Sequence, residues 1–282
     1  LISHTHLIYS SPATLAFNSP GAEGFGVKRA GLAVPDSVML IVSPGCCGRN
    51  TSVLSSMRAY QDRFYYLLMD ETDIVTGRHL KKIPKAVAEI CEGLKKKPSV
   101  VMICITCVDA LLGTDMERVC HKAEEYAGVP VRPCYMYALT REGRKPPMVH
   151  VRQSVYSLLE PKKKKGNVVN LLGYFSPLTD DCELYDLLHG AGVKTIHEIS
   201  RCKDYAQYQT MSEANFNLVL HPEARFAAED FHDRLKIPYI ELRRLYQIDK
   251  IASQYRALAA ALGVEFEDEI PRKAAEEAVE KF

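Results

Sequence analysis

The sequence predicts an α/β protein built on parallel sheets, and three observations lead to this fold class. Residues 38–48, VMLIVSPGCCG, begin with an apolar run typical of a strand covered on both faces, and the run ends abruptly at Pro44 and Gly45. A second apolar run, residues 100–105, ends in the same way and leads directly into Cys107. Strand and helix patterns then alternate along two successive arrays, which favours two parallel-sheet domains of the Rossmann-like or flavodoxin-like kind.

The first array, residues 1–160, alternates helix and strand from its first motif onwards. Ser19-Pro20-Gly21 opens a helical pattern, because proline is favoured at the first helical position. A loop that contains Gly77 is expected between the strand at 64–69 and a helix that ends near Leu94. The other elements expected here are strands at 38–43, 99–105 and 129–135 and helices at 50–60, 107–120 and 149–159.

A charged run, Pro161 to Gly166 with four consecutive lysines, separates the two arrays and is interpreted as a solvated linker. The second array, residues 161–282, is expected to form a second α/β domain. Its expected strands are at residues 167–172, 193–199, 217–220 and 237–240. Its expected helices end near Gly190 or Gly192 and at Gly263, because glycine commonly follows the last helical residue.

Composition excludes several classes of function. Lysine and arginine number 36 against 35 acidic residues, so the net charge of +1 gives no support for binding nucleic acid. No apolar stretch approaches the roughly 20 residues that a membrane-spanning helix needs. No secretory signal pattern opens the chain either. A cytoplasmic protein is therefore the expectation, and its nine cysteines are interpreted as metal ligands, reactive thiols or buried apolar groups.

The cysteines that follow the two apolar runs are the candidate site. Ligands of parallel α/β sheets collect at the carboxyl ends of the strands, which is where Cys46, Cys47 and Cys107 are expected. Thiolates suit iron–sulfur clusters or zinc. Neighbouring side chains diverge, so one of Cys46 and Cys47 is expected to be a ligand and the other a packing residue. From the residues alone, a cluster site and buried cysteines near strand ends both remain open.

The remaining cysteines and histidines carry no clear motif. Cys104 lies within an apolar run, Cys91 and Cys120 lie on apolar helix faces and are expected in the core, and Cys182 is expected to be a helix residue. His79 is expected at the surface. No role is assigned to Cys134 or Cys202, and the isolated histidines His150, His197 and His221 are expected to be satisfied surface or core residues.

The order of four segments resembles the N-terminal half of the nitrogenase component 1 family. The segments are SPGAEG, the apolar run with PGCCG, MDETDIVTGRHL and ITCVDALLGTD, and further similarity lies in GYFSP and IPYIEL of the second domain. The resemblance covers roughly residues 8–262. It implies two Rossmann-like domains of the nitrogenase component 1 type, and the third domain of family members is expected to be absent or truncated here.

The resemblance also implies site residues. The family's cluster cysteine after the Pro-x-Gly turn matches Cys47, with Cys46 one step out of register, and the cysteine of a second family motif matches Cys107. The family's first cysteine is replaced by Ser19, and Asp70 or Asp73 matches a segment that supplies a ligand in some relatives. Two thiolates from each of two subunits would hold one [4Fe-4S] cluster on a two-fold axis.

Three functions are therefore compared. The resemblance implies a subunit of a nitrogenase-like oxidoreductase, paired with an identical or paralogous subunit, which receives electrons from an ATP-dependent iron–sulfur reductase and reduces a substrate other than dinitrogen. The first alternative is a scaffold for cluster or cofactor assembly. The second is a metal-free Rossmann-like binding domain.

Overall fold

The computed structural model describes residues 23–45, 54–136, 145–265 and 269–280, and the chain divides into two compact units. The first unit contains residues 1–159 and Cys202–Tyr208, and the second contains Glu160–Arg201 and Gln209–Phe282. Each unit holds one four-stranded sheet in which every strand pair is parallel. The predicted α/β fold class is confirmed.

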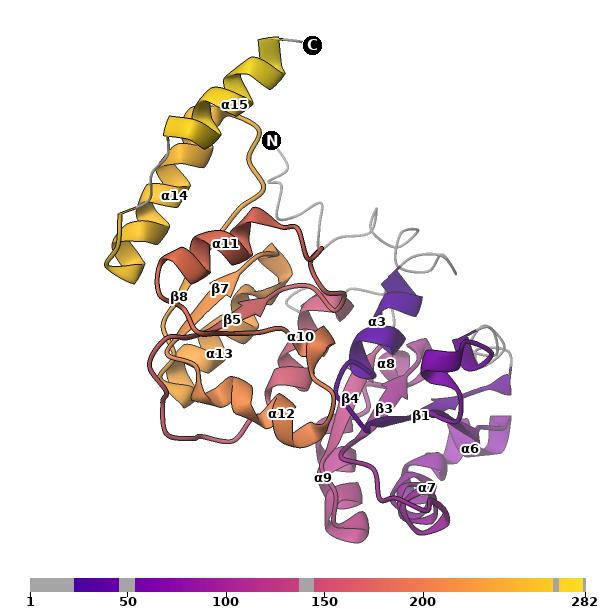
Figure 1. Cartoon of the computed structure of the whole chain (residues 1–282). Helices are drawn as coiled ribbons and strands as arrows, with labels where there is room; N and C mark the ends of the chain where they lie inside the picture. The colour runs from indigo at the N-terminus through magenta and orange to yellow at the C-terminus, as the bar shows by residue number, and fades with distance from the viewer. Residues whose placement is uncertain (1–22, 46–53, 137–144, 266–268, 281–282) are drawn as a thin grey trace. The chain divides into compact units, whose positions relative to one another are not determined.

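The first sheet has the strand order β2-β1-β3-β4, with β1 and β3 at its centre (Figure 1). Its strands are β1 (Val38–Ser43), β2 (Phe64–Leu68), β3 (Val101–Ile105) and β4 (Val131–Tyr135). Every residue of β1 and β3 is buried, as the unbroken apolar runs predict. Its helices are α3 (Glu23–Gly31), α6 (Glu71–Thr76), α7 (His79–Gly93), α8 (Cys107–Leu112), α9 (Met116–Ala127) and α10 (Pro147–Tyr156).

The two faces of this sheet pack against different helices, because side chains alternate between the faces along each strand. Val38, Leu40 and Val42 pack in one core cluster with side chains of α7 and α9, and so do the alternate residues of β3, Val101, Ile103 and Ile105. The opposite face meets α3 at Gly31, where a Cβ atom would lie 2.7 Å from Met39 Cε and 2.8 Å from Cys134 Sγ. Gly31 therefore lets α3 approach the strands closely.

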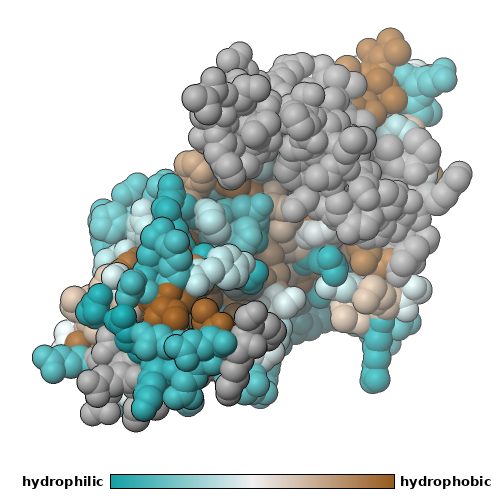
Figure 2. Space-filling model, turned by 90° about the horizontal axis from the view of Figure 1, so that it is seen from above, coloured by the Kyte–Doolittle hydropathy of each residue, from teal (hydrophilic) through white to brown (hydrophobic). Residues whose placement is uncertain are grey.

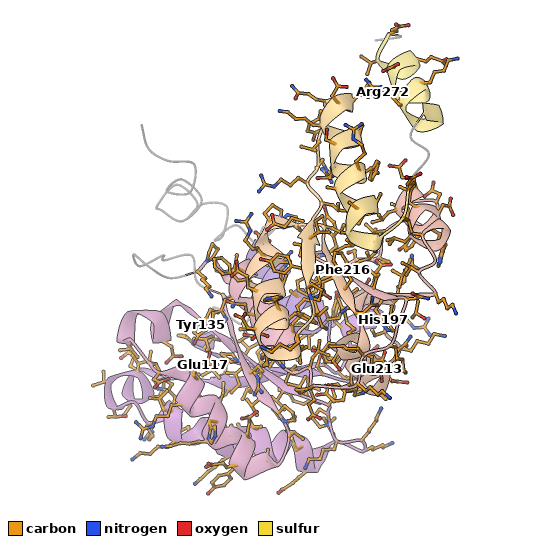
Figure 3. All side chains as sticks on the ribbon, turned by 90° about the vertical axis from the view of Figure 1, so that its left-hand side faces the viewer. Glu117, Tyr135, His197, Glu213, Phe216 and Arg272 are labelled. Carbon is orange, nitrogen blue, oxygen red and sulfur yellow. The ribbon has the colours of Figure 1, made fainter. Side chains whose placement is uncertain are left out.

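The second sheet repeats the same order, β6-β5-β7-β8. Its strands are β5 (Val168–Leu172), β6 (Thr195–His197), β7 (Phe216–Val219) and β8 (Tyr239–Glu241). Its helices are α11 (Glu183–Gly190), α13 (Arg225–Leu235), α14 (Ile248–Leu262) and α15 (Glu269–Glu280). Arg272 of α15 donates to Asp249 of α14 at 2.8 Å, and Figure 3 labels this arginine. The C-cap Gly263 has φ +70°, as its predicted position after the helix requires.

Three local expectations are corrected. The loop expected before Gly77 contains α6, because Asp70 and Asp73 form a reciprocal capping box that stabilises a helix of only six residues. Among the described residues, the helix expected to run to Tyr60 is interrupted: Leu54 and Ser55 are helical, a turn follows at Ser56, and Arg58–Tyr60 form a separate 3-10 turn. The strand expected at 193–199 covers only Thr195–His197.

A short helix that the sequence did not reveal, α12 (Tyr205–Gln209), begins within the segment Cys202–Tyr208 that belongs to the first unit. Tyr208 is fully buried, and its hydroxyl donates to the backbone oxygen of Val155 at 2.5 Å. The first unit therefore includes residues that follow the lysine-rich run in sequence.

The visible surface is mixed in character. On the face shown in Figure 2, the coloured side chains are mostly hydrophilic and apolar ones gather in small patches. No helix in the described ranges is long and apolar enough to cross a membrane.

Gly31→Ala is expected to lower the free energy of unfolding by about 1–3 kcal/mol, because the new methyl group overlaps two buried side chains. Gly93→Ala is the matched control, since a Cβ there meets no atom within 4 Å. It should be neutral or stabilise the protein by up to about 1 kcal/mol, because alanine is the better helix former. Urea denaturation measures both, and equal effects would contradict the close approach of α3.

Candidate functional site

The site predicted from the cysteines is expected at the carboxyl edge of the first sheet. Val42 of β1 pairs with Ile105 of β3, so the chain leaves these two neighbouring strands at the same level of the sheet. Cys107 follows Ile105 by two residues and begins α8, while Cys46 and Cys47 follow Ser43 by three and four residues. Parallel pairing therefore ends both strands at one edge, the edge at which the sequence predicts the cysteines.

The structure describes these residues to different extents. Ser19, Cys46 and Cys47 lie outside the described residues, and Cys107 is described only as the first residue of α8. Within the described ranges, no group of three histidine, cysteine or acidic side chains is arranged to hold a metal ion. The ligand assignment stays a prediction.

Asp70 lies at the same edge, after β2, and has a structural role. Its Oδ1 accepts a hydrogen bond from the backbone nitrogen of Asp73 at 2.6 Å, and its Oδ2 lies 3.6 Å from Arg78 Nη2. Asp73 is nearly fully buried. Hydrogen bonds from Lys82 and from Arg78 hold the pKa of the Asp73 carboxyl well below its usual range. Both aspartates therefore stabilise the turn from α6 to α7.

The expectation that His79 lies at the surface is wrong: the side chain is 1% exposed. Its Nδ1 lies 3.0 Å from the backbone oxygen of Asp73, and because a carbonyl oxygen only accepts, Nδ1 donates this bond. Its Nε2 lies 2.9 Å from Oδ1 of Asp109, which is also fully buried. The imidazole can be buried because both ring nitrogens have partners.

This pair joins the α6–α7 turn to the helix that begins at Cys107. Asp109 is the third residue of α8, and its Oδ1 also accepts from the hydroxyl of Thr114 at 3.0 Å. His79 thereby fixes the first turn of α8 against α7. No single residue in the sequence indicated this contact, since His79 and Asp109 are 30 positions apart.

Two buried hydroxyls lie at the same edge. Ser43 is the last residue of β1, and Thr106 directly precedes Cys107. Neither Ser43 Oγ nor Thr106 Oγ1 has a hydrogen-bond partner among the described residues, nor does Oδ2 of Asp109. Buried polar atoms normally have partners. The Asp109 oxygen is an acceptor, whereas the two hydroxyls are donors without an acceptor, and the sulfurs of an iron–sulfur cluster accept hydrogen bonds from such donors. The two hydroxyls therefore fit such a group.

Cys91, Cys104, Cys120 and Cys182 are packing residues. Cys104 is fully buried in β3, Cys120 is 2% exposed in α9, and Cys91 is half-buried against the same core. Burial raises the pKa of the Cys120 and Cys134 thiols, which disfavours the reactive thiolate. The predicted core positions of Cys91 and Cys120 are confirmed. Cys182 is the N-cap of α11 and packs against the second core.

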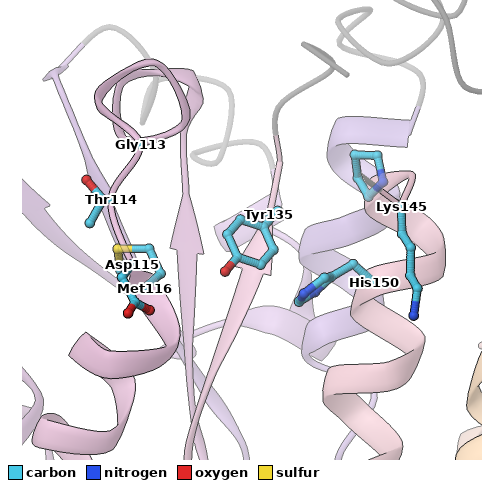
Figure 4. A pocket seen from close by; sticks show the side chains of 8 residues that line it. Gly113, Thr114, Asp115, Met116, Tyr135, Lys145 and His150 are labelled. Carbon is cyan, nitrogen blue, oxygen red and sulfur yellow. The ribbon is translucent and has the colours of Figure 1, made fainter. Parts of the chain in front are cut away.

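A cavity of about 390 Å³ adjoins this edge, between the end of β4 and the loop before α9 (Figure 4). Tyr135 and His150 meet inside it edge to face, with ring centroids 4.3 Å apart. Glu117, labelled in Figure 3, has its Oε1 3.9 Å from His150 Nε2. Burial, together with the charge of Lys145, lowers the pKa of His150 to about 4.

His150→Gln is expected to flatten the dependence of stability on pH between about 6.5 and 4. In this window the unfolded chain binds a proton that the folded His150 does not, so wild-type stability falls as the pH falls. Urea denaturation at several pH values measures this. Burial raises the pKa of Glu117, whose contribution has the opposite sign, so Glu117→Gln should steepen the same profile. Identical profiles for wild type and His150→Gln would refute the assignment.

Asp109→Ala is expected to lower the free energy of unfolding by about 1–3 kcal/mol, because it leaves the buried Nε2 of His79 without its hydrogen-bond partner. His79→Ala should have a similar effect, and the double variant should lose much less than the sum, since the two side chains form one interaction. The control is His121→Ala, whose exposed pair with Glu125 should contribute under about 1 kcal/mol. Additive losses for the buried pair would count against the coupling.

Comparison with known proteins identifies the family. A sequence profile described as nitrogenase component 1 type oxidoreductase matches residues 23–282. The chain belongs to this family, and the resemblance predicted from its motifs is confirmed.

The chain is similar to particular curated members. It is 27% identical over 239 residues to the nitrogenase iron-molybdenum cofactor biosynthesis protein NifE of Nostoc sp., covering 82% of this chain and 49% of that protein. It is also 27% identical over 266 residues to NifE of Klebsiella pneumoniae, covering 86% of this chain and 58% of that protein. The chain thus spans about half the length of these relatives.

Solved structures show the same fold. The structure described as nitrogenase Cp1 at pH 6.5 aligns with a TM-score of 0.65 at 18% identity, over 89% of this chain and 59% of that one. Cp1 at pH 5 aligns with a TM-score of 0.58 at 22% identity, over 90% of this chain and 53% of that one.

Proposed function

We propose that this chain is part of a cofactor-assembly scaffold of the nitrogenase component 1 type, which holds an iron–sulfur cluster or cluster precursor between two paired subunits. The observation that carries the proposal is the similarity to cofactor biosynthesis proteins over more than four fifths of the chain. The parallel strand ends that direct two cysteine-bearing segments to one edge support it.

Cys47 and Cys107 are the proposed ligands. Two thiolates from each of two subunits make the four that a [4Fe-4S] cluster needs, and the second subunit is an identical or paralogous chain. Cys46 is the alternative to Cys47. Ser19 serves as a hydrogen-bond donor or occasional ligand, whereas Asp70, already bonded as the cap of α6, holds the turn beside the site.

The second candidate is the electron-accepting subunit of a reductase. The description of the family as oxidoreductases and the fold shared with nitrogenase Cp1 favour it. In this function, an ATP-dependent iron–sulfur reductase would deliver electrons to a cluster that remains bound. The scaffold differs because its cluster is a cargo that leaves the protein.

Cys47→Ala and Cys107→Ala are each expected to remove most of the iron from anaerobically purified protein. Wild type should contain about two irons and two acid-labile sulfides per chain, the share of one [4Fe-4S] cluster between two chains. Cys91→Ala is the control, because this half-buried cysteine packs against the core of α7 and should leave the iron unchanged.

Iron-free wild-type protein would refute both cluster-binding functions and favour a metal-free binding domain. If Cys47→Ala keeps its iron and Cys46→Ala loses it, the ligand is Cys46 and not Cys47. The scaffold and the electron relay are separated by mixing iron-labelled protein with an excess of a metal-free ferredoxin. A scaffold should transfer its iron, whereas a relay should keep it through repeated reduction and oxidation.

A further inference from the structure

Ser43 and Thr106, whose hydroxyls are unpartnered among the described residues, lie at the ends of adjacent strands at the carboxyl edge of the first sheet. β1 and β3 are neighbours in register up to Val42 and Ile105, so Ser43 and Thr106 come next on adjacent strands. Ser43 is 0% exposed and Thr106 is 1% exposed. Their hydroxyl oxygens have no hydrogen-bond partner among the described residues, the other included.

Both side chains belong to the same face of the sheet. Val42 and Ile105 contribute to the core under α7 and α9, so strand alternation assigns Ser43 and Thr106 to the opposite face. Met39 and Met102 share that face, and both lie near Gly31 of α3. The Asp109 carboxylate instead bonds His79 of α7, so its free oxygen belongs to a different environment.

Leaving a buried hydroxyl unpaired is unfavourable. Two unpaired hydroxyls at adjacent strand ends therefore indicate that a hydrogen-bond acceptor binds near both of them. The two hydroxyls occupy the positions from which the chain leads to the proposed ligands: Thr106 directly precedes Cys107, and Ser43 precedes the segment of Cys46 and Cys47. Thiolate and sulfide sulfurs of an iron–sulfur cluster accept hydrogen bonds, and such bonds help to set its reduction potential.

We infer that Ser43 and Thr106 form a hydroxyl pair that donates hydrogen bonds to the sulfurs of the bound cluster and raises its reduction potential. The inference rests on the proposed function. A hydrogen bond to sulfur stabilises the more negatively charged reduced cluster, so it shifts the equilibrium towards the reduced form. The hydroxyls touch the cluster and are not its ligands, so their removal should change the potential without removing the iron.

The test is a reductive titration with dithionite of the full-length, cluster-loaded protein, followed by electron paramagnetic resonance. Ser43→Ala and Thr106→Val should each keep the iron content of wild type. Each should lower the ratio of reduced to oxidised cluster at a fixed potential by about tenfold, which is about 59 mV for a one-electron couple. Thr106→Ser keeps the hydroxyl and should titrate like wild type.

Ser154→Ala is the matched control. Ser154 is a buried serine of α10 in the same unit, and its hydroxyl already donates to the backbone oxygen of Pro133 at 2.9 Å. Its loss should leave the potential unchanged. Equal titration curves for wild type, Ser43→Ala and Thr106→Val, with iron retained, would overturn the inference.

Metal-free protein supplies a second readout. Without the cluster the two hydroxyls are buried and unpaired, so Ser43→Ala and Thr106→Val should raise the melting temperature, whereas Ser154→Ala should lower it. A lower melting temperature in all three variants would mean that the hydroxyls bond to protein groups and would contradict the inference. Absence of iron from wild type is a separate failure, since it refutes the proposed function itself and the inference with it.

Discussion

The parallel pairing of β1 with β3 is the constraint on which the candidate site depends. In a parallel pair, both chains leave the sheet at the same edge, and the register sets how far apart along the strand axis they leave. Here Val42 pairs with Ile105, so Ser43 and Thr106 follow on adjacent strands and both chains leave the sheet at the same level. An antiparallel pair would have sent them to opposite ends.

Packing on both faces of the sheet holds that register. A one-residue slip of β3 would exchange Val101, Ile103 and Ile105 with the side chains that meet α3, and both faces of this sheet are buried. The buried His79–Asp109 pair adds a polar restraint at the edge, because it orients the first turn of α8 after the strand has ended. Apolar packing therefore places the strands, and a specific hydrogen-bonded pair orients the helix that begins after β3.

The sequence was sufficient for the fold class because the central strands are long apolar runs and most helices carry clear apolar faces. It was insufficient where stability comes from contacts between distant residues. His79 is expected at the surface because a histidine beside a glycine turn is normally solvated, and its burial depends on two partners, the nearby backbone oxygen of Asp73 and the distant carboxylate of Asp109. The helix α6 has a local signal, the spacing of Asp70 and Asp73, but its six residues are too few for a periodic pattern. For the site, the sequence was sufficient to locate the two strand ends. The hydroxyl pair could not be predicted, because it depends on the register between β1 and β3, which no local sequence pattern reveals.

The segment Cys202–Tyr208 has a consequence for how the protein is made. Tyr208 is fully buried in the first unit and bonds to Val155, yet it is translated after β5 and β6 of the second unit. On the ribosome, the first unit therefore lacks part of its native packing until the chain has emerged beyond Tyr208. A fragment cut at the lysine-rich run would leave the Val155 carbonyl without this donor, so the two units are better regarded as one biosynthetic product than as separable modules.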